Sequence, residues 1–243
     1  MRPQIFNWER NWLKIADPSN LNNDQSTWQN RPSKPYPTKS LVNKRCLILL
    51  GDPGMGKSQT IRDLREKETN SDNLSLLLNL AIYRSRTELV TAITEDDIFK
   101  KWLNTNLVLY LYLDSLDEAD SHFNTVVEEL IEFFHKRIPS FNRLKLRIAC
   151  RINIWNHTAK EFEDSLKELW GKHVVEKYNL APLHNQDVAL AAKEGFNIKN
   201  IQGFWQEVES KNAYSLLHRP VTLIPLLNQY QELGQLAHSR AEL

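Results

Sequence analysis

A short glycine-rich segment has the residue types and the spacing needed to hold phosphate groups. Residues 51–58 fit the pattern G-x-x-x-x-G-K-[ST], in a chain that has only seven glycines. Glycines let the backbone curve around a phosphate with its N–H groups pointing inward, while the lysine reaches the terminal phosphates and the hydroxyl binds Mg²⁺. This segment is therefore predicted to bind a nucleoside triphosphate. The predicted ligand-binding residues are Gly51, Asp52, Pro53, Gly54, Met55, Gly56, Lys57, Ser58 and Gln59.

A second group of polar residues follows an apolar run of strand length. The run Leu107–Leu113 ends at Asp114, and Asp117 and Glu118 come shortly after it. An apolar strand that delivers carboxylates at its C-terminal end is typical of a Walker B motif. Asp114 and the Ser58 hydroxyl are predicted to bind hydrated Mg²⁺. Either Asp117 or Glu118 is predicted to orient or deprotonate an attacking water.

Residues 117–120 also spell Asp-Glu-Ala-Asp, the signature of the DEAD-box helicases. In those enzymes the metal-binding Asp opens the tetrad, so a buried strand must end directly before it. Here the preceding residues, Leu113-Asp114-Ser115-Leu116, are too polar to finish such a strand. A helicase core also needs two domains of this kind, and this chain has room for one. The strand is therefore predicted to end at Asp114, and the helicase assignment is rejected.

Both groups of residues need a parallel sheet to bring them together. Apolar runs alternate with segments of helical spacing, which predicts an α/β domain with helices on both faces of a parallel sheet. After Leu180 only helical patterns remain, which predicts a small helical subdomain. The predicted strands are 46–50, 74–80, 107–113, 144–149 and 173–178, and the predicted helices are 58–67, 86–103, 122–137, 159–170, 185–194, 200–210 and 220–233.

The same patterns divide the chain into three parts. Residues 1–44 are predicted to form a lead-in segment, with a short helix and a proline-rich connection. Residues 45–181 are predicted to form a P-loop NTPase domain, and residues 182–243 a helical lid subdomain. The alternating Arg143, Lys145 and Arg147 are predicted to lie on a half-exposed strand or in the loop before it.

Composition limits the partners and the location of the protein. Lys and Arg number 31 and Asp and Glu number 30, so the net charge of +1 gives no general attraction to nucleic acid or to anionic membranes. The N-terminus lacks an apolar signal core, and no run of apolar residues is long enough to span a membrane. Cys46 and Cys150 are predicted to be buried free thiols. A cytoplasmic location is therefore expected.

The acidic pattern resembles the second motif of the NACHT branch of the STAND NTPases, an apolar strand followed by D-G-x-D-E. Here it reads Asp114-Ser115-Leu116-Asp117-Glu118, and the serine in the glycine position is expected to be harmless. The sequence is also similar to that family at 146–151, its sensor strand, and at His218-Arg219-Pro220, its G-x-P element. The resemblance implies that Arg151 approaches the terminal phosphate, that Pro220 packs on adenine, and that the parallel strands have the order 5-1-4-3-2.

The resemblance further implies a domain that binds Mg²⁺ and ATP and changes conformation or assembly state on exchange or slow hydrolysis, as part of a signalling or defence protein. No guanine-specifying N-K-x-D pattern follows the fourth strand, which favours ATP over GTP. The expected partners are ATP and ADP, with self-assembly or effector and sensor domains outside this chain. No winged-helix domain of that family is expected in this sequence, and the chain is expected to match the nucleotide-binding core of a larger switch protein. Two alternatives are a turnover ATPase or phosphotransferase and a non-hydrolysing nucleotide-binding scaffold.

The implied strand order has a consequence for the two cysteines. Cys46 starts the first predicted strand, and Cys150 ends the fourth, which would be its parallel neighbour. The two thiols are therefore expected to lie at opposite ends of adjacent strands and to stay unpaired.

Overall fold

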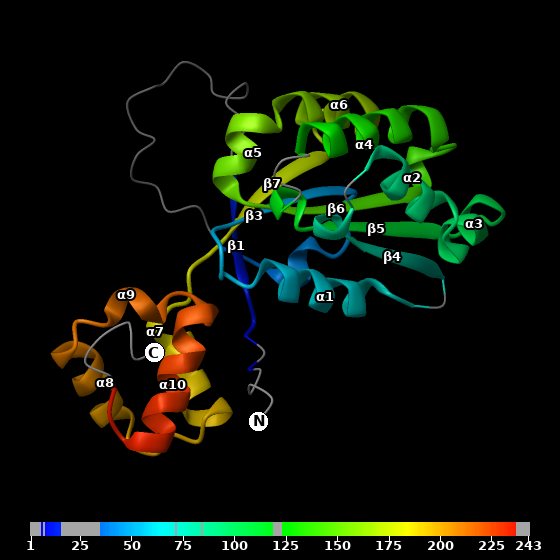
Figure 1. Ribbon diagram of the computed structural model, residues 1–243. Coiled ribbons are helices and arrows are strands. Elements are labelled where there is room, and N and C mark those ends of the chain that lie inside the picture. The colour runs from blue at the N-terminus through cyan, green and yellow to red at the C-terminus, as the bar shows by residue number, and fades with distance from the viewer. Residues whose placement is uncertain are drawn as a thin grey trace. The chain divides into compact units, whose positions relative to one another are not determined.

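The computed structural model describes residues 6, 8–15, 35–70, 72–83, 85–118 and 123–236. The chain divides into two compact units (Figure 1). The sheet unit comprises Asn11–Asp52 and Lys57–Leu180. The helical unit comprises Met1–Arg10, Pro53–Gly56 and Ala181–Leu243.

The sheet unit is built on a mostly parallel sheet. Its described residues form seven strands in the order β2-β1-β7-β3-β6-β5-β4. The five strands β7-β3-β6-β5-β4 are parallel. Numbered one to five in sequence order from β3 to β7, they lie in the order 5-1-4-3-2, which confirms the α/β class and the predicted order. The strands are β1 (Asn11–Ile15), β2 (Tyr36–Pro37), β3 (Cys46–Leu50), β4 (Asn73–Asn79), β5 (Val108–Asp114), β6 (Leu144–Cys150) and β7 (Val175–Leu180).

The N-terminal segment extends this sheet. The short helix predicted in it is wrong for residues 11–15, which form β1 and pair antiparallel with β7 and with β2. Trp12 explains the difference, because its side chain is fully buried and its indole Nε1 donates to Thr38 Oγ1 at 3.1 Å. Tertiary burial of one large side chain therefore decides the conformation of this short segment.

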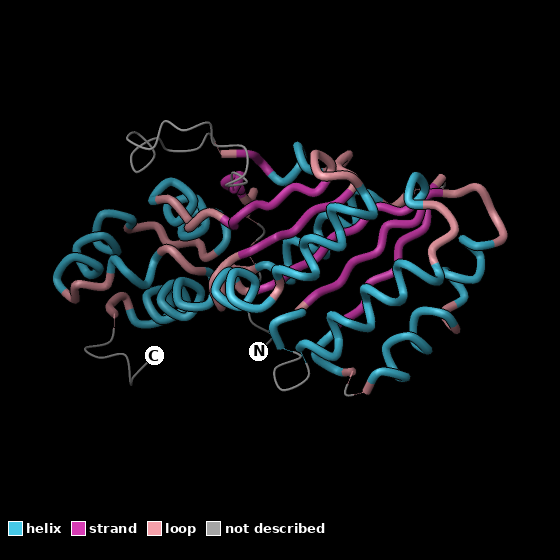
Figure 2. The backbone as a smooth tube through the Cα atoms, turned by 90° about the horizontal axis from the view of Figure 1, so that it is seen from above, coloured by secondary structure: helices cyan, strands magenta, loops and turns pink. Residues whose placement is uncertain are grey.

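Helices cover both faces of the sheet. Figure 1 shows α2, α4, α5 and α6 on one face and α1 on the other, and Figure 2 shows the strands side by side beneath the helices. The predicted helix 86–103 is divided in two, because Asp96 caps a second helix by accepting the Ile98 N–H at 2.8 Å. The helices are α1 (Lys57–Glu68), α2 (Arg86–Thr94), α3 (Asp97–Leu103), α4 (Phe123–Arg137), α5 (Ile152–Thr158) and α6 (Lys160–Trp170).

The two faces of the sheet have different chemistry. The face toward α2–α6 packs one apolar cluster, which includes Trp102 and Phe134. The face toward α1 contains a charged pair, because Arg147 Nη2 lies 2.5 Å from Glu68 Oε1 and both side chains have no solvent exposure. The prediction of a half-exposed strand is therefore wrong for Arg147. A glutamate at the end of α1 compensates its charge and allows full burial.

The two cysteines lie as predicted. In the parallel pair β3–β6, Cys46 is opposite Leu146 and Cys150 is opposite Leu50. The thiols are thus at opposite ends of neighbouring strands, separated by about 13 Å along the strand direction. Both are free and buried, and burial raises each thiol pKa to about 12.

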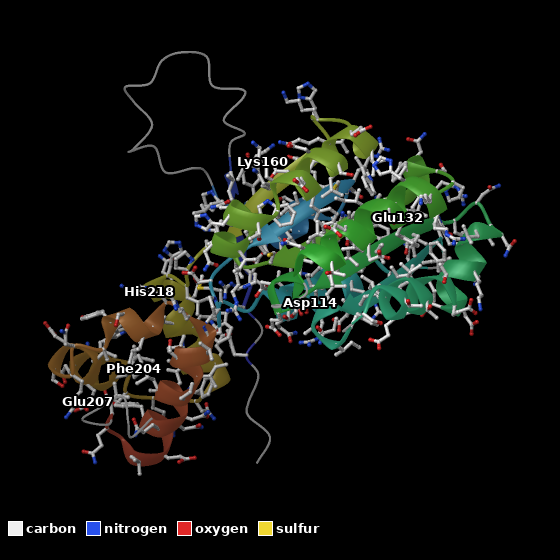
Figure 3. The ribbon with its side chains drawn as sticks, turned by 45° about the horizontal axis from the view of Figure 1, so that its top comes forward. Asp114, Glu132, Lys160, Phe204, Glu207 and His218 are labelled. Carbon is white, nitrogen blue, oxygen red and sulfur yellow. The ribbon has the colours of Figure 1, made fainter. Side chains whose placement is uncertain are left out.

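The helical unit has a hydrophobic core of its own. Phe204, labelled in Figure 3, is fully buried there with Phe196 and Leu227. Trp8 joins this core, and its indole Nε1 donates to Asp187 O at 3.3 Å. None of the described helices is long and apolar enough to cross a membrane. The helices of this unit are α7 (Asn185–Leu190), which continues as a π-turn (Ala191–Gly195), α8 (Ile201–Ser210), α9 (Tyr214–Leu217) and α10 (Pro220–Leu233).

Candidate nucleotide-binding site

The glycine-rich segment connects the end of β3 to the start of α1. Gly54 and Gly56 have φ angles of 75° and 91°, a backbone region that favours glycine. Lys57 is the first residue of α1, and its Nζ donates to Gly51 O at 2.7 Å and to Asp52 O at 3.2 Å. Burial lowers the pKa of Lys57, and Asp117 and Asp114 act in the opposite direction. The ammonium group thus lies over the loop, where carboxylates partly balance its charge.

Residues 53–56 also make contacts within the helical unit. The Val221 N–H donates to Gly54 O at 3.3 Å, and a Cβ atom on Gly54 would overlap Val221 Cγ1. Pro220, the first residue of α10, has its Cγ 3.7 Å from the Cβ position of Gly56. Pro220 therefore lies beside Gly56 within the helical unit. Val221 had no signal in the sequence beyond being next to Pro220.

Arg10 is a second loop neighbour that sequence reasoning missed. Within the helical unit its Nη1 lies 3.8 Å from the Cβ position of Gly56, and its Nη2 donates to Ala181 O at 2.7 Å. The side chain is buried, and burial lowers its pKa to about 10 against the opposing effect of Asp187. Nothing in its residue type or its position in the sequence singled it out.

The predicted metal ligands are in direct contact. Ser58 Oγ donates to Asp114 Oδ1 at 3.1 Å, and Asp114 is the last residue of β5 (Figure 3). The end of β5 at Asp114 confirms the register used to reject the helicase assignment. Mg²⁺ prefers hard oxygen ligands and is held by one or two carboxylates together with phosphates and waters. A hydroxyl and a carboxylate at this separation fit that ligand set. Among the described residues, this site included, no group of three or more His, Cys, Asp or Glu side chains could hold a metal ion.

A tight turn carries the remaining acids. Ser115 has a φ angle of 59°, and the Glu118 N–H donates to Ser115 O at 3.0 Å. Leu116 is fully buried in the apolar cluster and anchors the turn, while the Glu118 side chain is exposed. A backbone in this left-handed region favours glycine over a residue with a side chain. The serine is therefore not harmless, because this backbone region is unfavourable for residues with a Cβ atom.

We expect Ser115→Gly to raise the free energy of unfolding by about 0.5–1 kcal/mol. Relief of the left-handed strain, about 1–2 kcal/mol, exceeds the entropy that glycine loses on folding. Urea denaturation of the two proteins measures the difference. Ser115→Ala is the control, since it keeps the Cβ atom and should give no gain. Equal or lower stability of the glycine variant would contradict this account.

Asp117 and Arg151 form an ion pair across two strand ends. Asp117 Oδ2 lies 2.7 Å from Arg151 Nε, and Asp117 Oδ1 accepts the backbone N–H of Arg151 at 2.8 Å. The exposed fractions of the two side chains are 3% for Asp117 and 40% for Arg151. Arg151 directly follows β6, which is the neighbour of β5. Two residues predicted to act separately on water and on phosphate thus bind each other.

The remaining predicted residues lie at the margin of this arrangement. Asp52 and Pro53 are exposed, and Met55 is buried. Gln59 points along α1, where its Nε2 donates to Asp63 Oδ1 at 2.9 Å. The predicted residues that lie together in the sheet unit are Gly51, Lys57, Ser58, Asp114, Asp117 and Arg151.

The fold and the loop define a class. Parallel strands in the order 5-1-4-3-2, a G-x-x-x-x-G-K-S loop between the first strand and a helix, and an aspartate ending the third strand make this a P-loop NTPase fold.

Among solved structures, the chain is similar to the crystal structure of Cdc6p from Pyrobaculum aerophilum, with a TM-score of 0.40 and 20% identity. The match covers 62% of this chain and 44% of that one, so the chain spans less than half the length of that protein. A likeness of this size assigns no activity. No family model and no curated protein matches the sequence.

Proposed function

We propose that this chain binds Mg²⁺ and ATP and acts as a slowly hydrolysing switch domain of the STAND/NACHT type. The observation that carries the proposal is the contact of Ser58 Oγ with Asp114 Oδ1 at 3.1 Å, directly beside the lysine of the phosphate-binding loop. A chance glycine-rich turn has no reason to place its last hydroxyl on a carboxylate at the end of another strand.

Binding would use the loop and the start of α1. The backbone N–H groups of the loop surround the phosphates, and Lys57 exchanges the carbonyls of Gly51 and Asp52 for phosphate oxygens. Ser58 and Asp114 would hold Mg²⁺, which supplies neutralisation of the phosphate charge when it is bound. Burial of the Lys57 ammonium favours an anionic partner, because a buried cation is stabilised by opposite charge.

Hydrolysis and switching would use the residues after β5 and β6. Glu118 is exposed and can orient or deprotonate a water, with Asp117 as the alternative named from the sequence. Arg151 would contact the terminal phosphate and so distinguish ATP from ADP. Such a difference in interaction is what a nucleotide needs in order to shift a conformational equilibrium.

The parts of the chain would divide this work. Residues 45–181 would form the nucleotide-binding domain, and residues 182–243 a lid whose Pro220 contacts the base. The position of Pro220 beside Gly56 supports that role. Effector or sensor domains of a signalling or defence protein would lie outside this chain.

Nucleotide content and steady-state turnover test the proposal. A switch should retain ATP or ADP through purification and hydrolyse ATP far more slowly than the ~1–100 s⁻¹ of kinases. Rapid turnover with ready product release would instead identify a turnover ATPase or phosphotransferase. Binding without any hydrolysis would identify a nucleotide-binding scaffold. Calorimetric titration that detects no ATP binding would contradict all three.

We expect Glu118→Gln to preserve ATP affinity and to slow hydrolysis by about 10²–10⁴-fold, because glutamine cannot take the proton of the water. Single-turnover hydrolysis and ATP titration of the variant measure the two effects. Glu161→Gln is the matched control, since Glu161 is an exposed residue on α6. Hydrolysis at the wild-type rate would remove Glu118 from this role.

A further inference from the structure

We infer that Asp117 is a positioning residue that presents Arg151 to the terminal phosphate, and not the group that activates water. This inference rests on the proposed function, because it assigns one of two candidate acids of that same site. Its basis is the pair of contacts that Asp117 makes with a single residue.

Both oxygens of the Asp117 carboxylate contact Arg151, and the side chain is shielded from solvent. One oxygen accepts the Arg151 backbone N–H at 2.8 Å, and the other lies 2.7 Å from Arg151 Nε. Only 3% of the Asp117 side chain is exposed. A general base must come within hydrogen-bond distance of the water that it deprotonates. Glu118, the next residue, is exposed, so its carboxylate is open to a water molecule.

The direction of Asp117 is set by the turn that carries it. The left-handed conformation of Ser115 reverses the chain after β5, and buried Leu116 anchors it in the apolar cluster. The hydrogen bond from the Glu118 N–H to Ser115 O at 3.0 Å closes the turn. Asp117 lies between the anchor and the exposed Glu118, so it is held against the end of β6.

Arg151 is fixed on its backbone and through one atom of its side chain. Its N–H donates to Asp117 and its carbonyl accepts the Trp155 N–H at 3.0 Å at the start of α5. The guanidinium has five N–H donors, and the ion pair with Asp117 uses Nε. The side chain remains 40% exposed, so the Nη groups can meet a phosphate while Asp117 keeps Nε.

Two substitutions separate positioning from water activation. In Asp117→Asn, the amide oxygen can still accept the backbone N–H of Arg151. The amide nitrogen then faces Arg151 Nε–H, and two donors cannot form a hydrogen bond. The guanidinium is then released although the backbone contact remains. In Arg151→Lys, a single ammonium replaces the planar group, so it cannot bond to Asp117 and to a phosphate from separate edges.

The experiment measures the dissociation constants of ATP and ADP for the full chain, together with ATP hydrolysis. We expect Asp117→Asn to reduce the ADP/ATP ratio of dissociation constants about tenfold, as Arg151→Ala does. The double variant should show no further reduction, because both changes remove the same contact. Arg151→Lys should also reduce the ADP/ATP ratio of dissociation constants. Glu118→Gln is the matched control. It should keep the wild-type ADP/ATP ratio of dissociation constants but hydrolyse ATP more slowly.

Other outcomes overturn the inference. An Asp117→Asn variant that keeps the wild-type ratio but stops hydrolysis identifies Asp117 as the water-activating group. Additive effects of Asp117→Asn and Arg151→Ala show that the two residues act independently. If the asparagine variant does not fold, Asp117→Ser gives the same test, since its hydroxyl can accept the Arg151 N–H without pairing with Nε. A wild-type chain that binds neither nucleotide contradicts the proposed function itself, and the inference with it.

Discussion

Glu68→Gln is expected to lower the free energy of unfolding by about 3–5 kcal/mol, because it leaves the buried Arg147 guanidinium without its counter-charge. Arg147 Nη2 lies 2.5 Å from Glu68 Oε1, and neither side chain is exposed. The Tyr112 hydroxyl donates to Glu68 Oε2 at 2.5 Å, and Arg147 Nη2 also donates to Val42 O at 3.1 Å. Burial and the neighbouring Glu68 raise the pKa of Tyr112, so it remains a neutral donor.

Chemical denaturation measures this loss. Glu66→Gln is the matched control, because Glu66 is an exposed residue of the same helix and its change should stay within about 0.5 kcal/mol. Joint replacement of Glu68 and Arg147 by methionine should cost less than Glu68→Gln, since no uncompensated charge is then buried. A loss below 1 kcal/mol for Glu68→Gln would show that the pair is dispensable.

Lys57→Ala is expected to abolish the stabilisation of the protein by ATP. For the wild type this stabilisation is about 2.7 kcal/mol at an ATP concentration ~100-fold above the dissociation constant. Lys57 is the residue whose ammonium lies on the loop carbonyls of Gly51 and Asp52 at 2.7 and 3.2 Å. Without it, the terminal phosphates lose the cation that the loop presents to them.

Thermal melting with and without ATP and Mg²⁺ gives the result directly. Lys67→Ala serves as the control, because Lys67 is an exposed lysine near the other end of α1. The melting temperature of each variant without nucleotide separates a loss of binding from a loss of stability. An unchanged ATP-induced shift in Lys57→Ala would exclude the proposed phosphate site.

The sheet could be predicted because its signals are local. Each parallel strand is a continuous apolar run, and helical spacing separates one run from the next, which indicates the α/β class. The strand order came from the family resemblance, and the register of the strands confirms it. β1 was missed because its stability comes from the burial of Trp12 and from pairing with β7, which lies far away in the sequence.

The candidate site could be predicted only as a set of residues. The glycine-rich pattern and the acids after an apolar run identify which residues could form the site. The roles of these residues stay predictions. The sequence does not show that Asp117 pairs with Arg151, 34 residues away, or that Arg147 pairs with Glu68, 79 residues away. Such pairs depend on which strands become neighbours. The backbone angle of Ser115 was missed for another reason, since serine occurs freely in ordinary turns.

The buried contact of Glu68, Tyr112 and Arg147 also has a mechanical consequence. Glu68 belongs to α1, which also carries Lys57 and Ser58. Tyr112 belongs to β5, which ends at Asp114, and Arg147 belongs to β6, which leads into Arg151. The contact joins the C-terminal end of α1 to the middle of β6 and to β5 two residues before Asp114, whereas Lys57 and Ser58 lie at the N-terminal end of α1. α1 therefore resists sliding or rotating against the two strands. The lysine, the hydroxyl and the acid keep their spacing as parts of a single rigid frame.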